Sequence, residues 1–525
     1  MTDKSQDILI GIDAGTSLIK CVAFSVRGDV LAFSSTPNEY TTSNDEMAEQ
    51  DMLETRQKMI NTLKELVTKL GDKSYLISAV SVTAQGDGMW LVDAAGDPVH
   101  KGWLWLDSRA AEIATELEQN PLYDRLYELT GTAVNAAQAR TQMMWLDRHK
   151  PELLDKATTC YHPKDYLYFV LTGQRATDPG EGLFNFGDIR KGVYSDEVLS
   201  ILGLSHRANL LPPMIDGLDD SSNVLEAIAK LIGLPAGTPV HIGAIDVMCS
   251  ALGGGMYERG LDTAMTILGT TGVHLRYTSQ TDAISLPEEK TGYSIVFPGG
   301  GIAQLQTNMS ATLNIDWLVQ VAKEMAELSC TSVTTEQLLA QFDEKIDTDT
   351  PSRIVYHPYI STAGERGPFF DVNARASFSG LDQNVGFIDL AKAVYEGICF
   401  AAKDCYMQFG ELPVEIRITG GGANSVALKK LLANIMNRPV RSVSRAEAGA
   451  AGAAMIAAVG QGYYSSMSDC VADWVAPSLG EINEPIADSV KHFERNYHTY
   501  SELKNNLRPG WTNLADMRSS NHKPV

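Results

Sequence analysis

The first apolar run of the chain, ILIGI at residues 8–12, ends at Asp13 and a short polar turn. A nearly all-apolar run is typical of a central strand that is covered on both faces. Two further strand-like runs follow at 20–26 and 30–36, joined by the turn sequence RGD. A helix is predicted over 52–70, where apolar residues recur at helical spacing, and another strand begins near residue 77. This alternation predicts an α/β domain.

A similar pattern returns later in the chain. Residues 262–279 again read as strand, Gly-Thr turn and strand, and 390–409 read as a helix of small and apolar residues. Residues 415–440 read as strand, Gly-rich turn and helix, with the helix beginning near Asn424 or Ser425 and ending before Pro439. The chain therefore reads as two similar halves. We place their boundary near residues 247–258, and we expect 286–294 to be an exposed loop and 517–525 a frayed tail.

The bulk composition narrows the class of protein. A chain of 525 residues with 44% hydrophobic and 21% charged residues is expected to form two or more globular domains. Its formal net charge of −22 argues against a nucleic-acid partner, because phosphate backbones bind basic surfaces. The seven Cys residues form no CxxC motif, and no apolar run is long enough to cross a membrane. The polar N-terminus is unlike a signal peptide, so we expect a cytoplasmic protein.

Each of the two Gly-Thr turns offers backbone N–H groups and hydroxyls in a small concavity, which suits phosphate oxygens. Asp13 has the wrong charge for a phosphate, so we expect it to face a cation, and Mg²⁺ fits that need. Either turn alone could be an ordinary hairpin, with Asp13 capping backbone amides, but the repetition in both halves favours phosphate binding. The candidate phosphate ligands are Gly15, Thr16, Ser17 and Lys20 in the first half and Gly269, Thr270 and Thr271 in the second.

Three further segments carry candidate chemistry. TGGGANS at 419–425 follows a strand and opens a helix, where a nucleotide could lie close to the backbone. It lacks the GxGxxG spacing, and the chain has no Gly-Lys dipeptide, so a dinucleotide fingerprint and a P-loop are excluded. Asp246 lies in an otherwise apolar stretch, where a carboxyl group needs a partner or a function. Capping a helix is the simplest such function. AQGDGMW at 84–90 and WLDSRA at 105–110 mix carboxylates with aromatic residues, which suits a polyhydroxylated ligand.

These motifs, taken in order, resemble the FGGY family of carbohydrate kinases. The resemblance runs from about Ile8 to about Tyr464 and rests on GIDAGTS, LGTTG, ITGGGANS and AGAAGAAMIAAVGQG, with GAIDVMCSALGGG and HPKDYLYFVLTG between them. It implies the two-domain actin, hexokinase and Hsp70 fold, which is ribonuclease H-like, with a duplicated β-sheet core and an interdomain cleft. The implied domains are residues 1–250, which bind the sugar, and 251–525, which bind ATP.

The resemblance also implies roles for individual residues. Asp246 is the base beside the acceptor hydroxyl, and Asp13 helps to hold Mg²⁺. Thr16, Ser17 and Lys20 meet the transferring phosphate, and Thr270 with its flanking glycines holds phosphates from the other half. The adenosine is bordered by Gly421, Gly422, Asn424 and Ser425. The acceptor is bordered by Gln85, Gly86, Asp87, Asp107, Asp165 and Asp246.

Within the family, TAQGDGMWLVD, WLDSRAA and TDPGEGLFNFGDIR are most similar to erythritol kinases, and L-xylulose kinases come second. Gln85-Gly86 and Ala137 differ from the Arg-Glu and Tyr of glycerol kinases. The acceptor segments hold no cluster of Lys and Arg, so the ligand is expected to be neutral; Trp90 and Trp103 could form apolar walls or belong to the core. A homodimer is possible. The alternatives are a non-enzymatic nucleotide-dependent module of the same superfamily and an oxidoreductase, which would need the missing dinucleotide fingerprint.

Overall fold

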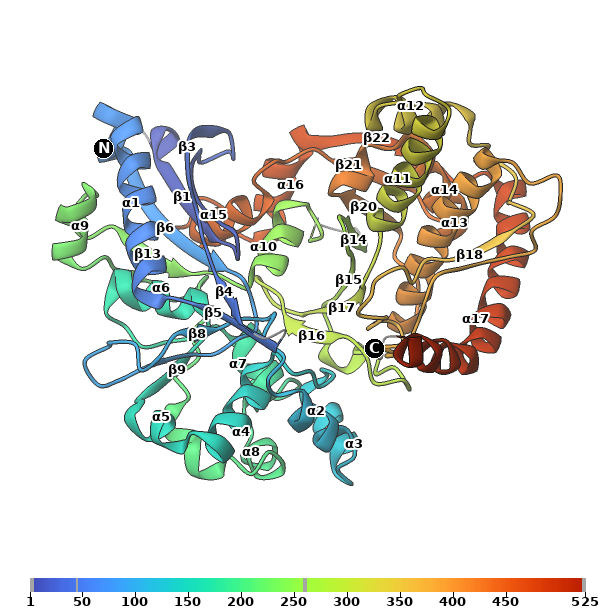
Figure 1. Cartoon of the computed structure of the whole chain (residues 1–525). Coiled ribbons are helices and arrows are strands. Elements are labelled where there is room, and N and C mark those ends of the chain that lie inside the picture. The colour runs from blue at the N-terminus through green and yellow to red at the C-terminus, as the bar shows by residue number, and fades with distance from the viewer. Residues whose placement is uncertain (1–3, 44–45, 258–261, 522–525) are drawn as a thin grey trace.

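Two large β-sheets form the two halves of the computed structural model, which describes residues 4–43, 46–257 and 262–521 (Figure 1). Within these ranges the first sheet has the strand order β12-β13-β6-β1-β2-β3 and the second has β16-β17-β15-β14-β20-β21-β22. The first sheet consists of β12 (Ser222–Asn223), β13 (Pro239–Ile242), β6 (Ile77–Ala84), β1 (Ile8–Ala14), β2 (Leu18–Ser25) and β3 (Val30–Pro37). The second consists of β16 (Tyr293–Val296), β17 (Ile302–Asn308), β15 (Gly272–Thr278), β14 (Thr263–Leu268), β20 (Glu415–Thr419), β21 (Val440–Val443) and β22 (Leu479–Asn483).

The two sheets repeat one topology. β1 pairs antiparallel with β2 and parallel with β6, and β6 pairs parallel with β13. In the same way β14 pairs antiparallel with β15 and parallel with β20, and β20 pairs parallel with β21. Each sheet is thus a hairpin joined to a run of parallel strands, and this repeat confirms the duplicated α/β core that the sequence predicts.

Helices cover both faces of the sheets, and α1 spans Met52–Leu70, as predicted. The other helices of the first half are α2 (Ala111–Glu118), α3 (Tyr123–Thr130), α4 (Ala139–His149), α5 (Pro151–Lys156), α6 (Pro163–Thr172), α7 (Pro179–Phe186), α8 (Asp196–Ile201), α9 (Glu226–Ile232) and α10 (Asp246–Gly253). Those of the second half are α11 (Thr312–Leu328), α12 (Thr335–Lys345), α13 (Phe387–Tyr406), α14 (Val426–Met436), α15 (Ala448–Gly460), α16 (Met467–Val475) and α17 (Ala487–Asn521). None of the helices in the described ranges has the length and apolar character needed to span a bilayer.

Short strands complete the architecture around the first sheet and beside α13. They are β4 (Thr41–Ser43), β5 (Met47–Gln50), β7 (Trp90–Val92), β8 (Gly102–Trp103), β9 (Thr159–Tyr161), β10 (Gly187–Asp188), β11 (Val193–Tyr194), β18 (Val355–His357) and β19 (Ser377–Ser379). β5 pairs with β4 and β8, and β7 pairs with β9. These pairings connect the long segments that leave the first sheet after β3 and after β6.

The two faces of β1 meet different layers, because alternate residues of a strand point to opposite sides. Ile8, Ile10 and Ile12 are buried in one core with the inner face of α1. Leu9 belongs to a second core on the opposite face, where α10 and α15 pack. The apolar run therefore lies between two covered faces, as its sequence predicts.

This second core joins the two halves of the molecule. It contains Leu9 of the first sheet, Met265 of the second, and buried side chains of α10, α15 and α16 between them (Figure 1). α15 follows β21 in sequence but packs on β1 and β6. We keep 1–250 and 251–525 as the proposed domains, with α15 as the element through which the second reaches the first sheet.

Small residues let the backbones of this central layer touch. A Cβ at Gly11 of β1 would lie 1.9 Å from the carbonyl oxygen of Ala450 in α15. A Cβ at Gly452 would lie 2.0 Å from that of Cys249 in α10, and one at Gly253 would lie 2.2 Å from that of Ala448. These distances are shorter than any real contact, so only glycine fits at the three crossings.

Two expectations for local structure need correction. Residues 286–294, predicted as an exposed loop, end in β16, where Tyr293 and Ser294 pair with Leu305 and Gln304 of β17. The Glu-Glu-Lys before this strand masks its Tyr-Ser-Ile-Val pattern in the sequence. Of the predicted C-terminal tail, residues 517–521 continue α17, and 522–525 lie outside the described residues.

We predict that Gly452→Ala lowers the free energy of unfolding by about 1–3 kcal/mol, the usual cost of overpacking a core. Gly510→Ala is the matched control, because Gly510 also lies in a helix and a Cβ there meets nothing within 4 Å. Removing a helical glycine at an open position should be neutral or stabilising. Thermal melts of both variants measure the difference, and an equal midpoint for the two would contradict the close crossing of α10 and α15.

Candidate active site

The predicted motifs of the first half meet at one edge of its sheet. β1, β6 and β13 run parallel, so their carboxyl ends lie at the same edge. The first Gly-Thr turn follows β1, the Gln85–Asp87 loop follows β6, and the segment leading to Asp246 follows β13. In open α/β sheets this edge is where ligands bind.

Thr16 connects the first turn to the loop after β6. Its hydroxyl donates to Gln85 Oε1 at 2.6 Å, and its carbonyl accepts from Gln50 Nε2 at 3.0 Å. Gln85 Nε2 in turn donates to Gln50 Oε1 at 2.8 Å. Ser17 is exposed at the tip of the turn, next to Thr16. The candidate phosphate turn and the candidate acceptor loop therefore form one hydrogen-bonded unit.

An exposed tryptophan that the sequence reading missed also belongs to this unit. Trp105 is 43% exposed, and its Nε1 donates to Thr16 Oγ1 at 2.9 Å. Trp90 and Trp103, the two candidate walls, are buried at 0% and 2% exposure and belong to the core. The signal for Trp105 was its place in WLDSRA, beside polar residues rather than in an apolar strand.

Asp13 lies on the face of β1 that meets α15. A Cβ at Gly449, in the first turn of α15, would lie 2.6 Å from Asp13 Oδ2. Burial raises the pKa of Asp13 to about 6, although the nearby Lys20 ammonium opposes the shift. Lys20 itself pairs with Glu447, 2.9 Å from Nζ to Oε2. Its charge is therefore partly balanced by the second half of the chain before any phosphate binds.

Asp246 is the first residue of α10, and Ile245 is its N-cap. Asp246 is thus not the N-cap residue, but its Oδ1 accepts from the Val247 N–H at 2.7 Å, so the carboxylate bonds to the backbone where the helix begins. Burial, together with the carboxylates of Asp13, Glu181 and Asp87, raises the pKa of Asp246 to about 8. A carboxyl group with a pKa near neutrality can accept a proton during a reaction.

The acceptor loop is strained and tightly packed. Asp87 has a φ of 54°, which is uncommon for a residue with a side chain, and a Cβ at Gly86 would lie 1.7 Å from Ile245 Cδ1. The Asp87 N–H donates to Glu181 Oε1 at 3.1 Å, and Oδ2 accepts from the Tyr293 hydroxyl at 2.8 Å. Oδ1 of Asp87 is buried and has no hydrogen-bond partner among the described residues. Sequence reasoning missed both Glu181 and Tyr293, which come from distant segments.

Asp165 lies behind this loop rather than at its surface. It is fully buried and pairs with Lys164 at 2.6 Å, and the Lys164 ammonium also pairs with Asp178 at 2.6 Å and Glu181 at 2.8 Å. Burial alone would raise the pKa of Asp165, but Lys164 outweighs it and lowers the pKa to about 2. Asp165 thus holds the cation that orients Glu181, and Glu181 is the carboxylate that reaches the loop.

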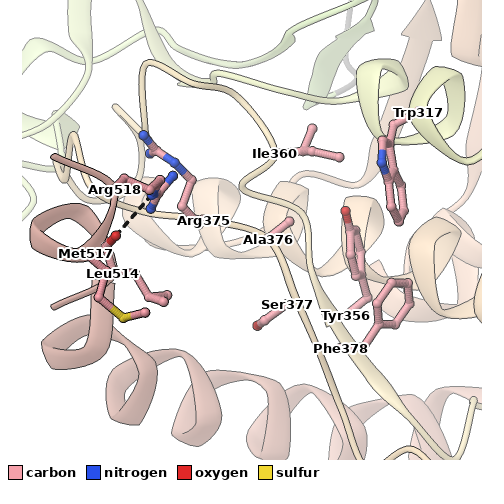
Figure 2. A pocket seen from close by; sticks show the side chains of 10 residues that line it. All are labelled: Trp317, Tyr356, Ile360, Arg375, Ala376, Ser377, Phe378, Leu514, Met517 and Arg518. Atoms are coloured by element: carbon pink, nitrogen blue, oxygen red, sulfur yellow. Dashed lines mark hydrogen bonds between the residues drawn. The ribbon is translucent and has the colours of Figure 1, made fainter. Parts of the chain in front are cut away.

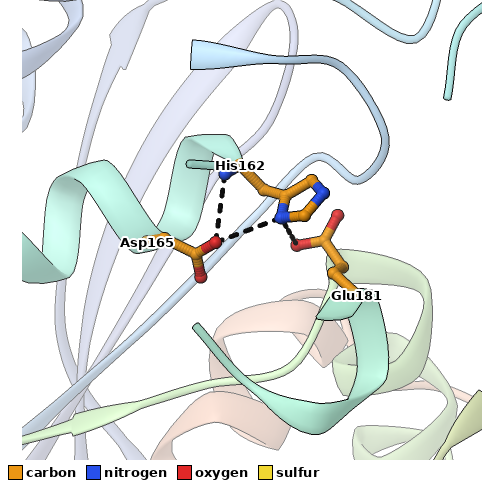
Figure 3. A group of neighbouring side chains, drawn as sticks. All are labelled: His162, Asp165 and Glu181. Atoms are coloured by element: carbon orange, nitrogen blue, oxygen red, sulfur yellow. Dashed lines mark hydrogen bonds and ion pairs between the residues drawn. The ribbon is translucent and has the colours of Figure 1, made fainter. Parts of the chain in front are cut away.

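His162, Asp165 and Glu181 have the spacing of a metal site (Figure 3). His162 Nδ1 lies 3.1 Å from Asp165 Oδ2 and 3.7 Å from Glu181 Oε2. Because the Lys164 ammonium already pairs with both carboxylates, this cluster has its cation, and we assign no metal to it.

Asp107 is occupied in a similar way. It is 1% exposed, accepts from the Ala48 N–H at 2.9 Å and pairs with Arg109 at 2.6 Å. Arg109 also pairs with Glu49 at 2.8 Å and stacks over the Trp103 ring. Asp107 therefore fixes Arg109 and the backbone of β5, and its oxygens are already hydrogen-bonded.

The second half presents its motifs at the matching strand ends. Gly269, Thr270 and Thr271 form the turn between β14 and β15, with the two threonines exposed. The Gly269 N–H donates to the Thr271 carbonyl at 3.0 Å, and the Gly269 and Thr270 carbonyls accept from the segment that begins α11. The first turn is closed in a similar way but is one residue longer, because the Gly15 N–H donates to the Leu18 carbonyl at 3.0 Å.

The Gly-rich turn after β20 is a 3₁₀ turn over Gly421–Asn424, in which Gly421 and Asn424 are exposed and Gly422 is buried. Ser425 is the N-cap of α14, as one of the two predicted candidates, and its hydroxyl pairs with Asp343 at 2.5 Å. Its side chain is thus engaged by protein, whereas Asn424 beside it is exposed.

A cavity with aromatic and basic walls lies elsewhere. It has a volume of about 630 Å³ and is bounded by Trp317 and other aromatic side chains on one side and by Arg375 and Arg518 on the other (Figure 2). None of its lining residues is among the predicted site residues. The candidate active site is therefore defined by the convergence of side chains at strand ends and not by this cavity.

Two family models match most of the chain and identify its fold. The N-terminal domain model of the FGGY family of carbohydrate kinases matches residues 8–253, and the C-terminal domain model matches 264–461. The chain belongs to the FGGY family of carbohydrate kinases. Membership implies ATP and a sugar or polyol as substrates, and it confirms the two-domain kinase fold.

Individual relatives narrow the comparison. The chain is 44% identical to the erythritol kinase of Brucella abortus over 98% of both chains, and 26% identical to the xylulose kinase of Bacillus subtilis over 98% and 99%. Its fold is similar to that of gluconate kinase from Lactobacillus acidophilus, with a TM-score of 0.87, 21% identity and coverage of 97% and 99%. These likenesses confirm the family resemblance that the motifs carry.

We predict that Lys164→Met destabilises the protein by about 3–5 kcal/mol, because removing one partner leaves buried carboxylates without a cation. The pKa values of those carboxylates should then rise, so they take up protons as the pH falls. The difference in melting temperature from the wild type should therefore be larger at pH 8 than at pH 5.

Lys191→Met is the control, because Lys191 pairs with Asp188 at 2.8 Å but is 71% exposed. It should leave the melting temperature almost unchanged. A Lys164→Met protein that melts like the Lys191→Met protein at pH 8 would mean that Lys164 does not balance the buried cluster.

Proposed function

We propose that the chain transfers the γ-phosphate of ATP to a terminal primary hydroxyl of erythritol. The observation that carries the choice of substrate is the 44% identity to an erythritol kinase over 98% of both chains. The xylulose kinases that the chain resembles are 24–27% identical, which makes a ketose the second candidate. The other alternative, a non-enzymatic nucleotide-dependent module, rests on a shared fold alone, and a shared fold does not support a particular function.

Asp246 is our candidate for the base. The acceptor hydroxyl must lose its proton as its oxygen attacks the γ-phosphorus, and a carboxylate beside it can take that proton. The raised pKa of Asp246 brings its proton affinity closer to that of a base working near neutral pH. Asp13, at the end of β1 on the other side of β6, keeps its proposed role as the group that faces a cation.

The carboxyl groups of this edge fit a hard divalent cation. Asp13 and Asp246 offer carboxylate oxygens, and desolvation raises the pKa of each even though the Lys20 ammonium opposes the shift of Asp13. We therefore keep Mg²⁺ as the proposed ion, with Asp13 as its candidate ligand. When bound, the ion would neutralise phosphate charge. Thr16, Ser17 and the turn at Gly269–Thr271 are the candidate phosphate donors from the two halves.

Two cations near the acceptor loop are already paired with carboxylates, which favours a neutral ligand. Lys164 is fully paired with three carboxylates, and Arg109 is paired with Asp107 and Glu49. Gln85 and Asp87 offer an amide and a carboxylate to hydroxyl groups. A site built to pair hydroxyls rejects analogues that lack them, because its own polar groups would stay unsatisfied.

We predict that ATP-dependent turnover with erythritol exceeds that with glycerol, xylitol, L-xylulose and D-xylulose in kcat/KM. A coupled assay for ADP, run with Mg²⁺ and each acceptor in turn, gives the comparison. If a ketose clearly outperforms erythritol, the substrate is wrong while the kinase activity stands. If no neutral polyol or sugar stimulates ADP release, the proposed activity itself is wrong.

A further inference from the structure

Tyr293 reaches the acceptor loop from the other half of the chain. It lies on β16, the edge strand of the second sheet, and its hydroxyl donates to Asp87 Oδ2 of the first half at 2.8 Å. Asn135 Nδ2 donates to the same hydroxyl oxygen at 2.5 Å. Because Asn135 donates to the Tyr293 hydroxyl oxygen, the hydroxyl proton must point to Asp87. Tyr293 is therefore the donor and Asp87 the acceptor.

The position of the Tyr293 ring is also fixed. The ring meets Phe184 of α7 edge to face, with centroids 5.6 Å apart at 83°. Its neighbour Ser294 donates its N–H to Thr132 Oγ1 at 3.1 Å, and the Ala133 N–H donates to the Gly292 carbonyl at 2.9 Å. β16 is therefore bound to the first half on both sides of Tyr293, which leaves the hydroxyl little freedom to leave Asp87.

The consequence for Asp87 is that its two oxygens differ. Oδ2 is used by Tyr293, whereas Oδ1 is buried and has no partner among the described residues. The left-handed backbone at Asp87 and the Glu181 carboxylate on its N–H hold the residue in this orientation. An unpaired buried oxygen is costly unless a ligand or water completes it. Asp87 Oδ1 is therefore an acceptor atom that no hydrogen bond of the described residues uses.

We propose that Tyr293 is a positioning residue of the acceptor site, which orients Asp87 so that Oδ1 accepts a hydrogen bond from one hydroxyl of the polyol. This inference rests on the proposed kinase function. In this proposal Asp246 meets the hydroxyl that is phosphorylated, and Asp87 reads a different one. Tyr293 thereby adds a residue of the second half to the recognition of the acceptor.

The test is Tyr293→Phe, which keeps the ring against Phe184 and removes only the hydroxyl. The KM for erythritol should rise by about 10-fold or more, the effect of losing one hydrogen bond to a charged group. The kcat and the KM for ATP should stay within about threefold, because the phosphate turns are untouched. Without the donor from Tyr293 the pKa of Asp87 should also rise, so the acid limb of kcat/KM for the polyol should move to higher pH.

Monodeoxy analogues of erythritol, such as butane-1,2,4-triol, show which hydroxyl is read. In the wild type, kcat/KM should fall sharply for the analogue that lacks the hydroxyl bound by Asp87. In Tyr293→Phe that analogue should lose much less relative to erythritol, because the interaction is already weakened. If another polyol or a ketose proves to be the substrate, its own deoxy analogues replace these.

Tyr127→Phe is the matched control. The Tyr127 hydroxyl also crosses between the halves, donating to the Thr291 carbonyl at 3.1 Å, but it does not touch Asp87. This variant should keep the KM for the polyol and every analogue ratio of the wild type. Equal effects of the two variants, or unchanged analogue ratios in Tyr293→Phe, would overturn the proposal. Wild-type protein that no polyol or sugar stimulates would instead overturn the proposed function.

Discussion

The crowding of desolvated carboxyl groups around the ends of β1, β6 and β13 is the constraint on which the site depends. Asp13, Asp246, Glu181 and Asp87 come from four segments, and burial together with mutual repulsion raises the pKa of Asp246 to about 8. Such an arrangement costs stability in the free protein, and it persists only because the surrounding structure fixes each member. Our proposed roles for Asp13 as a cation ligand and Asp246 as a base both rest on this crowding.

Close backbone contacts, and not only charge pairs, hold these carboxyl groups in place. Gly11, Gly449 and Gly452 allow α15 to approach β1 and α10 closely, which brings the start of α15 against Asp13. Behind the acceptor loop, Lys164 balances Asp165 and holds Glu181 in place. The second half thus contributes twice to an edge of the first sheet, through α15 and through β16.

Local patterns predicted much of this architecture. The apolar run of β1, the two Gly-Thr turns, the helix at 52–70 and the N-cap at Ser425 all depend on neighbouring residues, and the structure places them as expected. Asp246 stood out because a lone carboxyl group in an apolar stretch needs a reason.

The other contacts of the site could not be predicted from neighbouring residues in the sequence. Tyr293 meets Asp87 from 206 positions away, and Glu181 meets it from 94 positions away, so no spacing rule connects them. Sequence reading also placed Asp107 and Asp165 at the acceptor, whereas their oxygens are taken by Arg109 and Lys164. Which carboxylate faces a ligand depends on which cation the fold has already paired with its neighbours.

The most direct measurement is the turnover and stability of Asp246→Asn, which keeps the shape of the side chain and removes the base. The account predicts that kcat for erythritol falls at least about 10²-fold while ATP binding is retained. The raised pKa of Asp246 costs the wild type stability increasingly between pH 4 and its folded value of about 8. Without Mg²⁺ and nucleotide the variant should therefore melt higher than the wild type, by more at pH 8 than at pH 5. Near-normal turnover in this variant would contradict the account, because it would remove Asp246 from the proton transfer.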